Sequence, residues 1–165
     1  MNFHEGDTVM HWTYGLGKVM RLEERDLSGS IIPYYAVKVR EMTVWVPADG
    51  NLGSRLRFPT SPAGFKRLLT ILSGPGEPIP EDRQERRTHF LELFKDGRAE
   101  SLCKVIRDLS VYQKSHKLND NDQSFLKQAR RAMLAEWEFV RSITPEQAEL
   151  ELHRILQSEP AGNSS

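Results

Sequence analysis

The apolar residues of this 165-residue chain change their spacing once, near Pro59. Before this point they alternate with polar residues in short runs rich in Val, Tyr, Trp and Thr, a pattern typical of β-strands. After it they recur at intervals of three and four, which is typical of amphipathic helices. A chain with its strands first and its helices second is expected to fold as an α+β protein of two modules.

Residues 1–58 are expected to form a small, strongly bent β module. Gly15 and Gly17 permit positive φ angles between the first two strands, and Gly29 does the same before the third. The alternation places Lys38, Thr43 and Trp45 on the face opposite the inward-pointing valines. The expected strands cover residues 7–12, 17–24, 33–39 and 42–46.

Residues 59–157 are expected to form an all-helical module. Ser61 is a suitable N-cap before Pro62, and Asn119 and Thr144 mark two later helix starts. The proline- and glycine-rich stretch 74–80 cannot continue a helix and is expected to be a stiff connector. The expected helices lie near residues 61–74, 81–97, 99–115, 119–140 and 144–156, and residues 158–165 are expected to form a flexible tail.

Composition and the first residues predict a soluble protein of the cytoplasm. Hydrophobic residues make up 38% of the chain, and no run approaches the roughly 18 apolar residues of a membrane span. Residues 1–5 lack the basic and apolar segments of a signal peptide. The single cysteine, Cys103, cannot form an internal disulfide, which agrees with a reducing compartment.

No motif in the sequence predicts catalysis, so we expect neither an enzyme nor a cofactor or metal site. The chain has no phosphate-binding loop, no nucleophile elbow and no metalloprotease helix motif. Its five histidines lack the spacing of metal ligands, and Cys103 lies among apolar helix positions. Carboxylate pairs such as Glu136 and Glu138 are interpreted as residues at alternating or solvent-exposed positions.

The chain carries 23 basic and 23 acidic residues, so any contact with nucleic acid must depend on local basic clusters. Arg83, Arg86 and Arg87 lie on one face of an expected helix and could reach phosphates. An equally good interpretation pairs them with the acidic residues of the same turn as solvated salt bridges. A second basic cluster on polar helical faces comprises Lys104, Arg107, Lys127, Arg130 and Arg131.

A series of short motifs runs through both modules. The β module contains Gly6-Asp7-x-Val9, Tyr14-Gly15-x-Gly17-x-Val19, Tyr34-Tyr35-x-Val37-Lys38-Val39 and Val44-x-Val46-Pro47. The helical module adds Ile106-Arg107-Asp108-Leu109 and Leu126-Lys127-Gln128-Ala129-Arg130. In order and spacing, over about residues 1–141, these motifs resemble the CarD/CdnL family, RNA polymerase-binding transcription factors of bacteria. The N-terminal module of that family is shared with transcription-repair coupling factors.

The resemblance implies a Tudor-like β-barrel module that docks on the polymerase β subunit by pairing at a sheet edge. Contacts with this partner are expected at Arg25, Lys38, Thr43, Trp45 and Pro47, with Trp45 as an anchor on the partner-facing sheet. The alternative for Trp45 is a structural role, in which its ring covers the edge of the barrel.

The resemblance also implies that the helical module contacts promoter DNA at the upstream edge of the opened bubble. Family members wedge a tryptophan into the minor groove, whereas Arg83 occupies that position here and no tryptophan lies between Trp45 and Trp137. Arginine favours a narrow minor groove but is a poorer steric wedge. The expected DNA contacts are Arg83, Arg86, Arg87, Lys104, Lys127, Arg130 and Arg131.

Our leading hypothesis is a non-enzymatic transcription regulator that docks on RNA polymerase and stabilises the promoter open complex, without attachment to a membrane. A second hypothesis is a protein-only adaptor that uses the same sheet edge and makes no functional DNA contact. A third, an enzyme, would need an ordered metal ion or a deep polar pocket.

Overall fold

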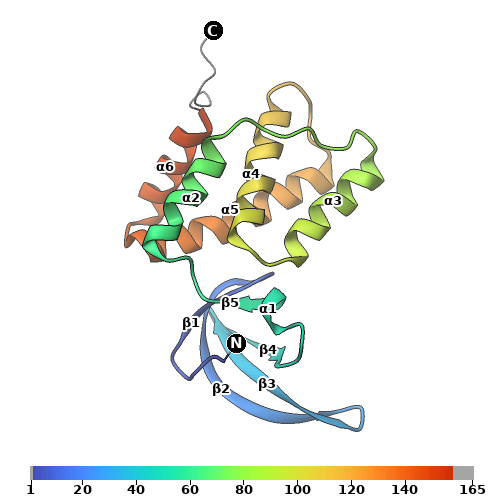
Figure 1. Cartoon of the computed structure of the whole chain (residues 1–165), viewed down its shortest axis with the longest axis vertical. Coiled ribbons are helices and arrows are strands. Elements are labelled where there is room, and N and C mark those ends of the chain that lie inside the picture. Colours follow the sequence, from blue (N-terminus) through green and yellow to red (C-terminus); the bar gives the residue numbers. More distant parts are fainter. Residues whose placement is uncertain (1, 158–165) are drawn as a thin grey trace. The chain divides into compact units, whose positions relative to one another are not determined.

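The computed structural model describes residues 2–157, which form two compact units (Figure 1). The first, which we call the β unit, ends at Pro59, and the second, the helical unit, begins at Thr60. This division lies one residue from the boundary expected from the sequence. The predicted α+β class is confirmed, and the tail predicted at residues 158–165 lies outside the described residues.

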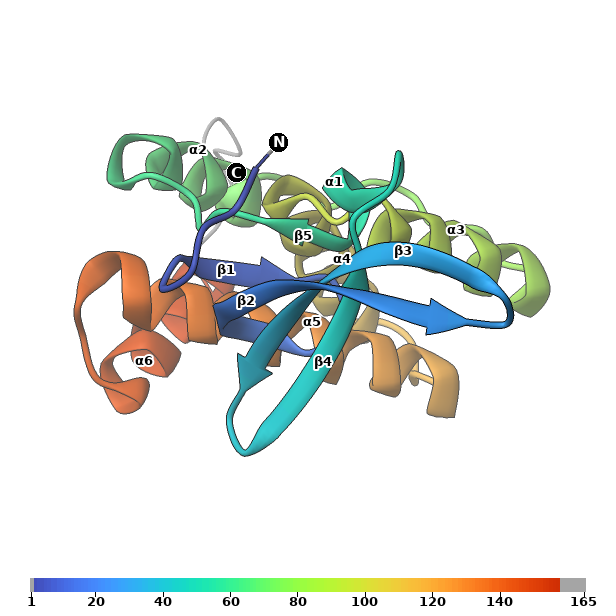
Figure 2. The same ribbon diagram turned by 90° about the horizontal axis from the view of Figure 1, so that it is seen from below.

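The β unit is an antiparallel sheet with the strand order β4-β3-β2-β1-β5. Its longest feature is the hairpin of β2 and β3, which extends beyond the neighbouring strands (Figure 2). The sequence pattern predicted the middle of this hairpin but neither its full length nor α1 and β5. The elements are β1 (Thr8–His11), β2 (Gly15–Leu27), β3 (Ser30–Val39), β4 (Met42–Pro47), α1 (Leu52–Arg55) and β5 (Leu56–Arg57).

A tight turn and a bulge set the register between β2 and β3. β2 pairs with β3 up to Leu27 and Ser30, so the connecting loop is the two residues Ser28 and Gly29, both with positive φ. Such two-residue loops suit the right-handed twist of a hairpin. A bulge at Met20 shifts the β2–β3 register by one residue and bends the sheet.

The core of the β unit lies on one face of the sheet. Alternate residues of β3 and β4, with Val19 of β2, lie in a cluster there that includes Phe3, whose ring meets Tyr35 edge-on at 5.6 Å. Leu52 of α1 and Leu56 of β5 belong to the same cluster. We call this side the inner face and the opposite side the outer face.

The glycine-rich turn after β1 has a structural explanation. The Nδ1 atom of the buried His11 accepts hydrogen bonds from the backbone N–H groups of Thr13 and Tyr14, each 3.1 Å long. Burial lowers the pKa of His11 to about 4, so this ring is neutral near pH 7. A side chain at Gly17 would lie within 3 Å of the Lys38 carbonyl and of two valine methyl groups.

The helical unit is a bundle in which α4 contacts α2, α3 and α5 (Figure 1). Side-chain caps open three helices as the sequence suggests: Ser61 accepts from Gly64, Asn119 from Asp122, and Thr144 from Gln147. Asp82, which the sequence did not mark as a cap, accepts from Glu85. Phe65, Phe90, Ile106 and Trp137 fill the core. The helices are α2 (Pro62–Ser73), α3 (Arg83–Lys95), α4 (Ala99–Gln113), α5 (Asp120–Arg141) and α6 (Pro145–Gln157).

One carboxylate interpreted from the sequence as alternating or solvent-exposed is buried. Glu136 on α5 is completely inaccessible, and its Oε2 accepts hydrogen bonds of 2.7 Å from both the N–H and the hydroxyl of Thr60. The exposed interpretation of Glu136 is therefore wrong. It failed because the partner donors lie 76 residues away in the sequence.

Candidate functional site

The β4 strand forms one edge of the sheet and, within residues 2–157, pairs with β3 alone. The Ala48 N–H donates to the Pro33 carbonyl at 3.0 Å, which marks that pair as hydrogen-bonded. Because hydrogen-bonded and non-hydrogen-bonded pairs alternate in an antiparallel ladder, Thr43 and Trp45 direct their backbone N–H and C=O groups away from β3. These groups can receive a further strand, and Pro47, which has no N–H, ends the run.

The side chain of Trp45 lies on the outer face, opposite the core of the β unit. It shares a cross-strand row with Ala36 and Arg21, and Ala36 is fully buried beneath its neighbours. The guanidinium carbon of Arg25 lies 4.3 Å from the centre of the Trp45 ring, and that of Arg21 lies 5.4 Å away. These cation–π contacts hold the half-buried ring against the sheet beside its open edge.

The other contacts predicted for this surface are close to Trp45 in the ladder. Lys38 and Thr43 are directly opposite each other and exposed, and Pro47 is half-buried at the end of β4. Arg25 is half-buried and lies 3.9 Å from Glu23. The structure thus places the five predicted residues on the outer face, on β4 and on the next two strands of the sheet, where sequence reasoning overlooked Arg21.

The arginines at the start of α3 do not share one face. Arg83 and Arg87 are exposed, whereas Arg86 is 5% exposed and its Nε donates to Asp122 of α5 at 2.9 Å. Its Nη1 donates to the carbonyls of Pro80 and Glu81. The hydrogen bond with Asp122 raises the pKa of Arg86. The expectation that Arg86 contacts DNA does not fit this burial, because its donors already have partners inside the protein.

A signal in the sequence could have shown which way Arg86 points. It precedes Phe90 by four residues and Phe94 by eight, so it lies on the same buried stripe of α3. Within the described chain, neither Arg83 nor Arg87 forms an ion pair with the acidic residues nearby. The carboxylate of Asp82 instead accepts the N–H of Glu85 at 3.0 Å as the helix cap.

The second basic cluster divides in a similar way. Lys127 and Arg131, four residues apart on α5, are exposed, and Lys104 and Arg130 are half-buried. In the part of the chain that the structure describes, these four cations have no carboxylate partner. Arg107 is buried, and its Nε donates to Asp108 at 2.8 Å. The free cations of the helical unit are those with space to bind phosphates.

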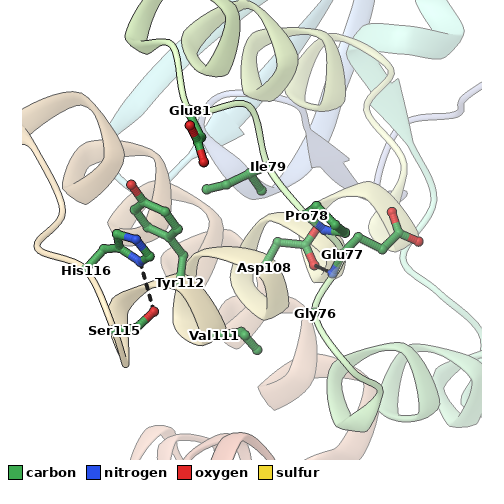
Figure 3. Close-up of a pocket in the computed structure, with 10 residues that line it drawn as sticks. All are labelled: Gly76, Glu77, Pro78, Ile79, Glu81, Asp108, Val111, Tyr112, Ser115 and His116. Atoms are coloured by element: carbon green, nitrogen blue, oxygen red, sulfur yellow. Dashed lines mark hydrogen bonds between the residues drawn. The ribbon is translucent and has the colours of Figure 1, made fainter.

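An open pocket of about 620 Å³ lies between the proline-rich connector and the end of α4 (Figure 3). The rings of Tyr112 and His116 stack there at 4.3 Å, and the Glu77 N–H donates to Asp108 at 3.0 Å. His116 also lies 2.9 Å from the Ser115 hydroxyl, but both residues are exposed. Across residues 2–157, no three His, Cys, Asp or Glu side chains are arranged to hold a metal ion.

Comparison with known proteins matches both units in the order of the chain. Residues 3–56 match the family model described as "CarD-like/TRCF RID domain", and residues 67–153 match the one described as "CarD, C-terminal domain". The first match agrees with the Tudor-like β module expected from the sequence. In the described part of the chain, no helix is long and apolar enough to span a membrane.

A bacterial relative matches across both units of this chain. The Bacillus subtilis (strain 168) protein named "Putative transcription factor YdeB" is 25% identical to this chain over 148 residues. The matched region covers 88% of this chain and 96% of that protein. Because the two family models together cover most of the chain, one on each unit, this protein belongs to the CarD-like family.

Proposed function

We propose that this protein is a non-enzymatic transcription regulator of the bacterial cytoplasm that docks on the β subunit of RNA polymerase. Membership of a transcription factor family supports the general role. The docking surface is the open edge of β4, where Thr43 and Trp45 offer backbone groups to a strand of the polymerase. Arg25, Lys38 and Pro47 flank this edge.

The observation that carries the proposal is an edge strand, β4, whose side away from β3 has no partner strand within residues 2–157 and which carries the aromatic side chain of Trp45. An exposed strand edge favours pairing with other chains unless it is blunted by charge, proline or a covering segment. β4 itself has no charged residue, and Trp45 contributes a large apolar surface next to the outward-facing groups. This is the arrangement expected of a strand-addition site with a side-chain anchor.

The helical unit is proposed to contact promoter DNA and to stabilise the open complex. Arg83 lies directly after the connector, at the first residue of α3, and it is exposed together with Arg87. Lys127 and Arg131 on α5 offer further free cations, with Lys104 and Arg130 beside them in the cluster. Arg86 is omitted from this set because its guanidinium is bound to Asp122.

Capture of purified RNA polymerase by the immobilised protein tests the docking step. Thr43→Pro removes an outward N–H and is expected to abolish capture, because a partner strand can no longer bond there. Thr8→Pro, a proline at the start of β1, is the matched control and should retain capture. Equal capture by wild type and Thr43→Pro would refute docking through the β4 edge.

The adaptor hypothesis remains the second candidate, and two observations favour it. The position of the family's wedge tryptophan is occupied by Arg83, and one of the expected phosphate contacts, Arg86, is buried. Binding to a promoter fork should be measured between 50 and 200 mM salt. A DNA-binding regulator that uses four cations should show a log–log slope of about −3 to −4, and an adaptor should show none.

A further inference from the structure

The outer face of the sheet carries more positive than negative charge beside the open edge. Across β2, β3 and β4 the cross-strand register places four basic residues there and a single acidic residue, Glu23, whose carboxylate accepts a hydrogen bond from Arg21 at 2.5 Å and so offsets only one of the four charges. Two of the basic residues, Lys18 and Arg21, were not among the partner contacts expected from the sequence. The basic residues of this face are Lys18, Arg21, Arg25 and Lys38.

Two of these cations are placed unfavourably for the isolated protein. Lys18 of β2 lies directly opposite Lys38 of β3, and both side chains are exposed. Like charges in directly opposed positions destabilise a sheet. Within residues 2–157 neither lysine pairs with a carboxylate. An anionic group supplied by a partner would remove this repulsion.

Small residues allow the positive charges to reach the edge strand. Ala36 separates Arg21 from Trp45 in their cross-strand row, and the Arg21 guanidinium extends over it to within 5.4 Å of the Trp45 ring centre. Thr43, the neighbour of Lys38, is also short. Lys38 therefore lies about 10 Å, or two strand spacings, from any strand that joins β4, with no large side chain between them.

A strand added to β4 would meet different surroundings on its two faces. Residues opposite Thr43 and Trp45 would point to the outer face, because directly opposed residues share a face of the sheet. A residue opposite Val44 would point to the inner face, where Val44 packs against the core. The outer positions are close to cations, and the inner position continues an apolar surface.

We propose that the strand received by β4 alternates acidic and apolar residues, with carboxylates opposite Thr43 and Trp45 and an apolar residue opposite Val44. This inference rests on the edge docking proposed above and specifies the partner's chemistry. Arg21 and Lys38 are then the residues that select an acidic strand. The ring of Trp45 gives that strand an apolar contact on the outer face, next to the two cations.

A pair of peptides that differ in charge tests the inference directly. The capped hexapeptides Glu-Val-Glu-Val-Glu-Val and Gln-Val-Gln-Val-Gln-Val are nearly isosteric and can be titrated into the full chain while the amide resonances of residues 42–47 are followed. At low salt the Glu peptide is expected to bind about tenfold more tightly than the Gln peptide, and 0.5 M salt should reduce this ratio. Equal affinities would overturn the inference.

Charge-reversal variants identify which cations contribute to binding of the acidic peptide. Lys38→Glu and Arg21→Glu should each lower affinity for the Glu peptide by about fivefold to tenfold. Lys66→Glu makes the same charge change on an exposed position of α2 and should have no effect. The inference fails if Lys38→Glu and Arg21→Glu bind the Glu peptide as tightly as wild type does. It also fails if duplex DNA displaces the Glu peptide from the outer face.

Capture of RNA polymerase separates this inference from the proposed function. Unchanged capture by Lys38→Glu and Arg21→Glu would contradict the acidic strand and leave edge docking intact. Selective binding of the Glu peptide without any polymerase capture would contradict docking on polymerase and support the chemistry assigned to the edge.

Discussion

The two units of the protein use arginine in opposite ways. In the β unit, Arg21 and Arg25 lie on the outer face of the sheet and hold Trp45 against it. In the helical unit, Arg86 and Arg107 are buried and donate to Asp122 and Asp108. An arginine on an open sheet can exchange its contacts for those of a partner, whereas a buried arginine is committed to the fold.

This difference separates the surfaces available for binding from the groups that fix the architecture. Asp122 connects the buried ion pair to the start of α5, because its second oxygen accepts the N–H of Asn119 in a capping box. One side chain therefore joins α3 to the first turn of α5. Removing Arg86 and removing Trp45 should accordingly have different consequences, the first for folding and the second for binding.

Arg86→Ala should have the largest effect on stability. It leaves the Asp122 carboxylate buried without its charge partner, which typically costs 3–5 kcal/mol. The free energy of unfolding can be measured by urea titration, with the helical circular dichroism signal as the probe. A decrease in the free energy of unfolding below about 1 kcal/mol would show that Arg86 is a surface residue in solution. Arg86 would then again be a candidate for contact with DNA.

A double variant distinguishes loss of a charge pair from loss of packing. Arg86→Met with Asp122→Asn removes both charges, retains an apolar stem and preserves an oxygen for the capping box. We expect it to recover at least half of the stability that Arg86→Ala loses. Arg87→Ala, at the exposed neighbouring position, should change stability by no more than about 0.5 kcal/mol.

The second largest expected effect is a loss of stability of the β unit at acidic pH, caused by His11. His11 has a pKa of about 4 in the folded protein and 6.5 as its ordinary value. Between these values the unfolded chain binds a proton that the folded chain excludes, so stability decreases as the pH falls from 6.5 to 4. The loss is at most about 3 kcal/mol. From about one pH unit above 6.5 the ring is neutral in both states and contributes no further pH dependence.

His11→Asn isolates this contribution from that of the other titrating groups. The Asn side-chain oxygen can accept the N–H groups of Thr13 and Tyr14, and it does not titrate. Urea unfolding followed by tryptophan fluorescence should show a smaller decrease in stability for His11→Asn than for wild type over pH 6.5 to 4. If stability falls equally with pH in His11→Asn and in wild type, His11 is not the source of the acid sensitivity.

The regular parts of this fold were predictable from the sequence, and the contacts between distant residues were not. Helix positions followed from local signals such as Ser61 before Pro62 and the proline-rich connector. The pairs Arg86–Asp122 and Thr60–Glu136 join residues 36 and 76 positions apart. Local spacing identifies polar residues on a helix but does not supply the partner that makes burial possible.

The candidate site shows the same limit. Alternation correctly placed Trp45, Lys38 and Thr43 on the outer face, because period-two patterns fix the face of a strand. Arg21 was overlooked, since the bulge at Met20 shifts β2 by one residue and brings Arg21 opposite Ala36. A bulge of this kind has no reliable sequence signature, so the cation–π contact became visible only in the structure.

Trp45→Ala should reduce binding without unfolding the β unit. The ring lies outside the core cluster, so we expect a stability loss below about 1 kcal/mol. Loss of an aromatic anchor should weaken capture of RNA polymerase by about 2 kcal/mol, or thirtyfold. Trp12→Ala, which removes the exposed second tryptophan of the same unit, is the matched control. A collapse of thermal stability in Trp45→Ala would instead assign the ring to the barrel edge.

The smallest expected effect concerns Arg83, the residue that the sequence resemblance aligns with the family's wedge. An exposed arginine that contacts one phosphate should, when changed to Ala, lower the salt slope of promoter-fork binding by about 1. It should also shorten the open-complex lifetime a few-fold, with polymerase capture unchanged because the docking edge lies in the β unit. Arg67→Ala, at an exposed position of α2, should alter neither quantity. An unchanged slope and lifetime in Arg83→Ala would argue that arginine does not replace the wedge, and would favour the adaptor.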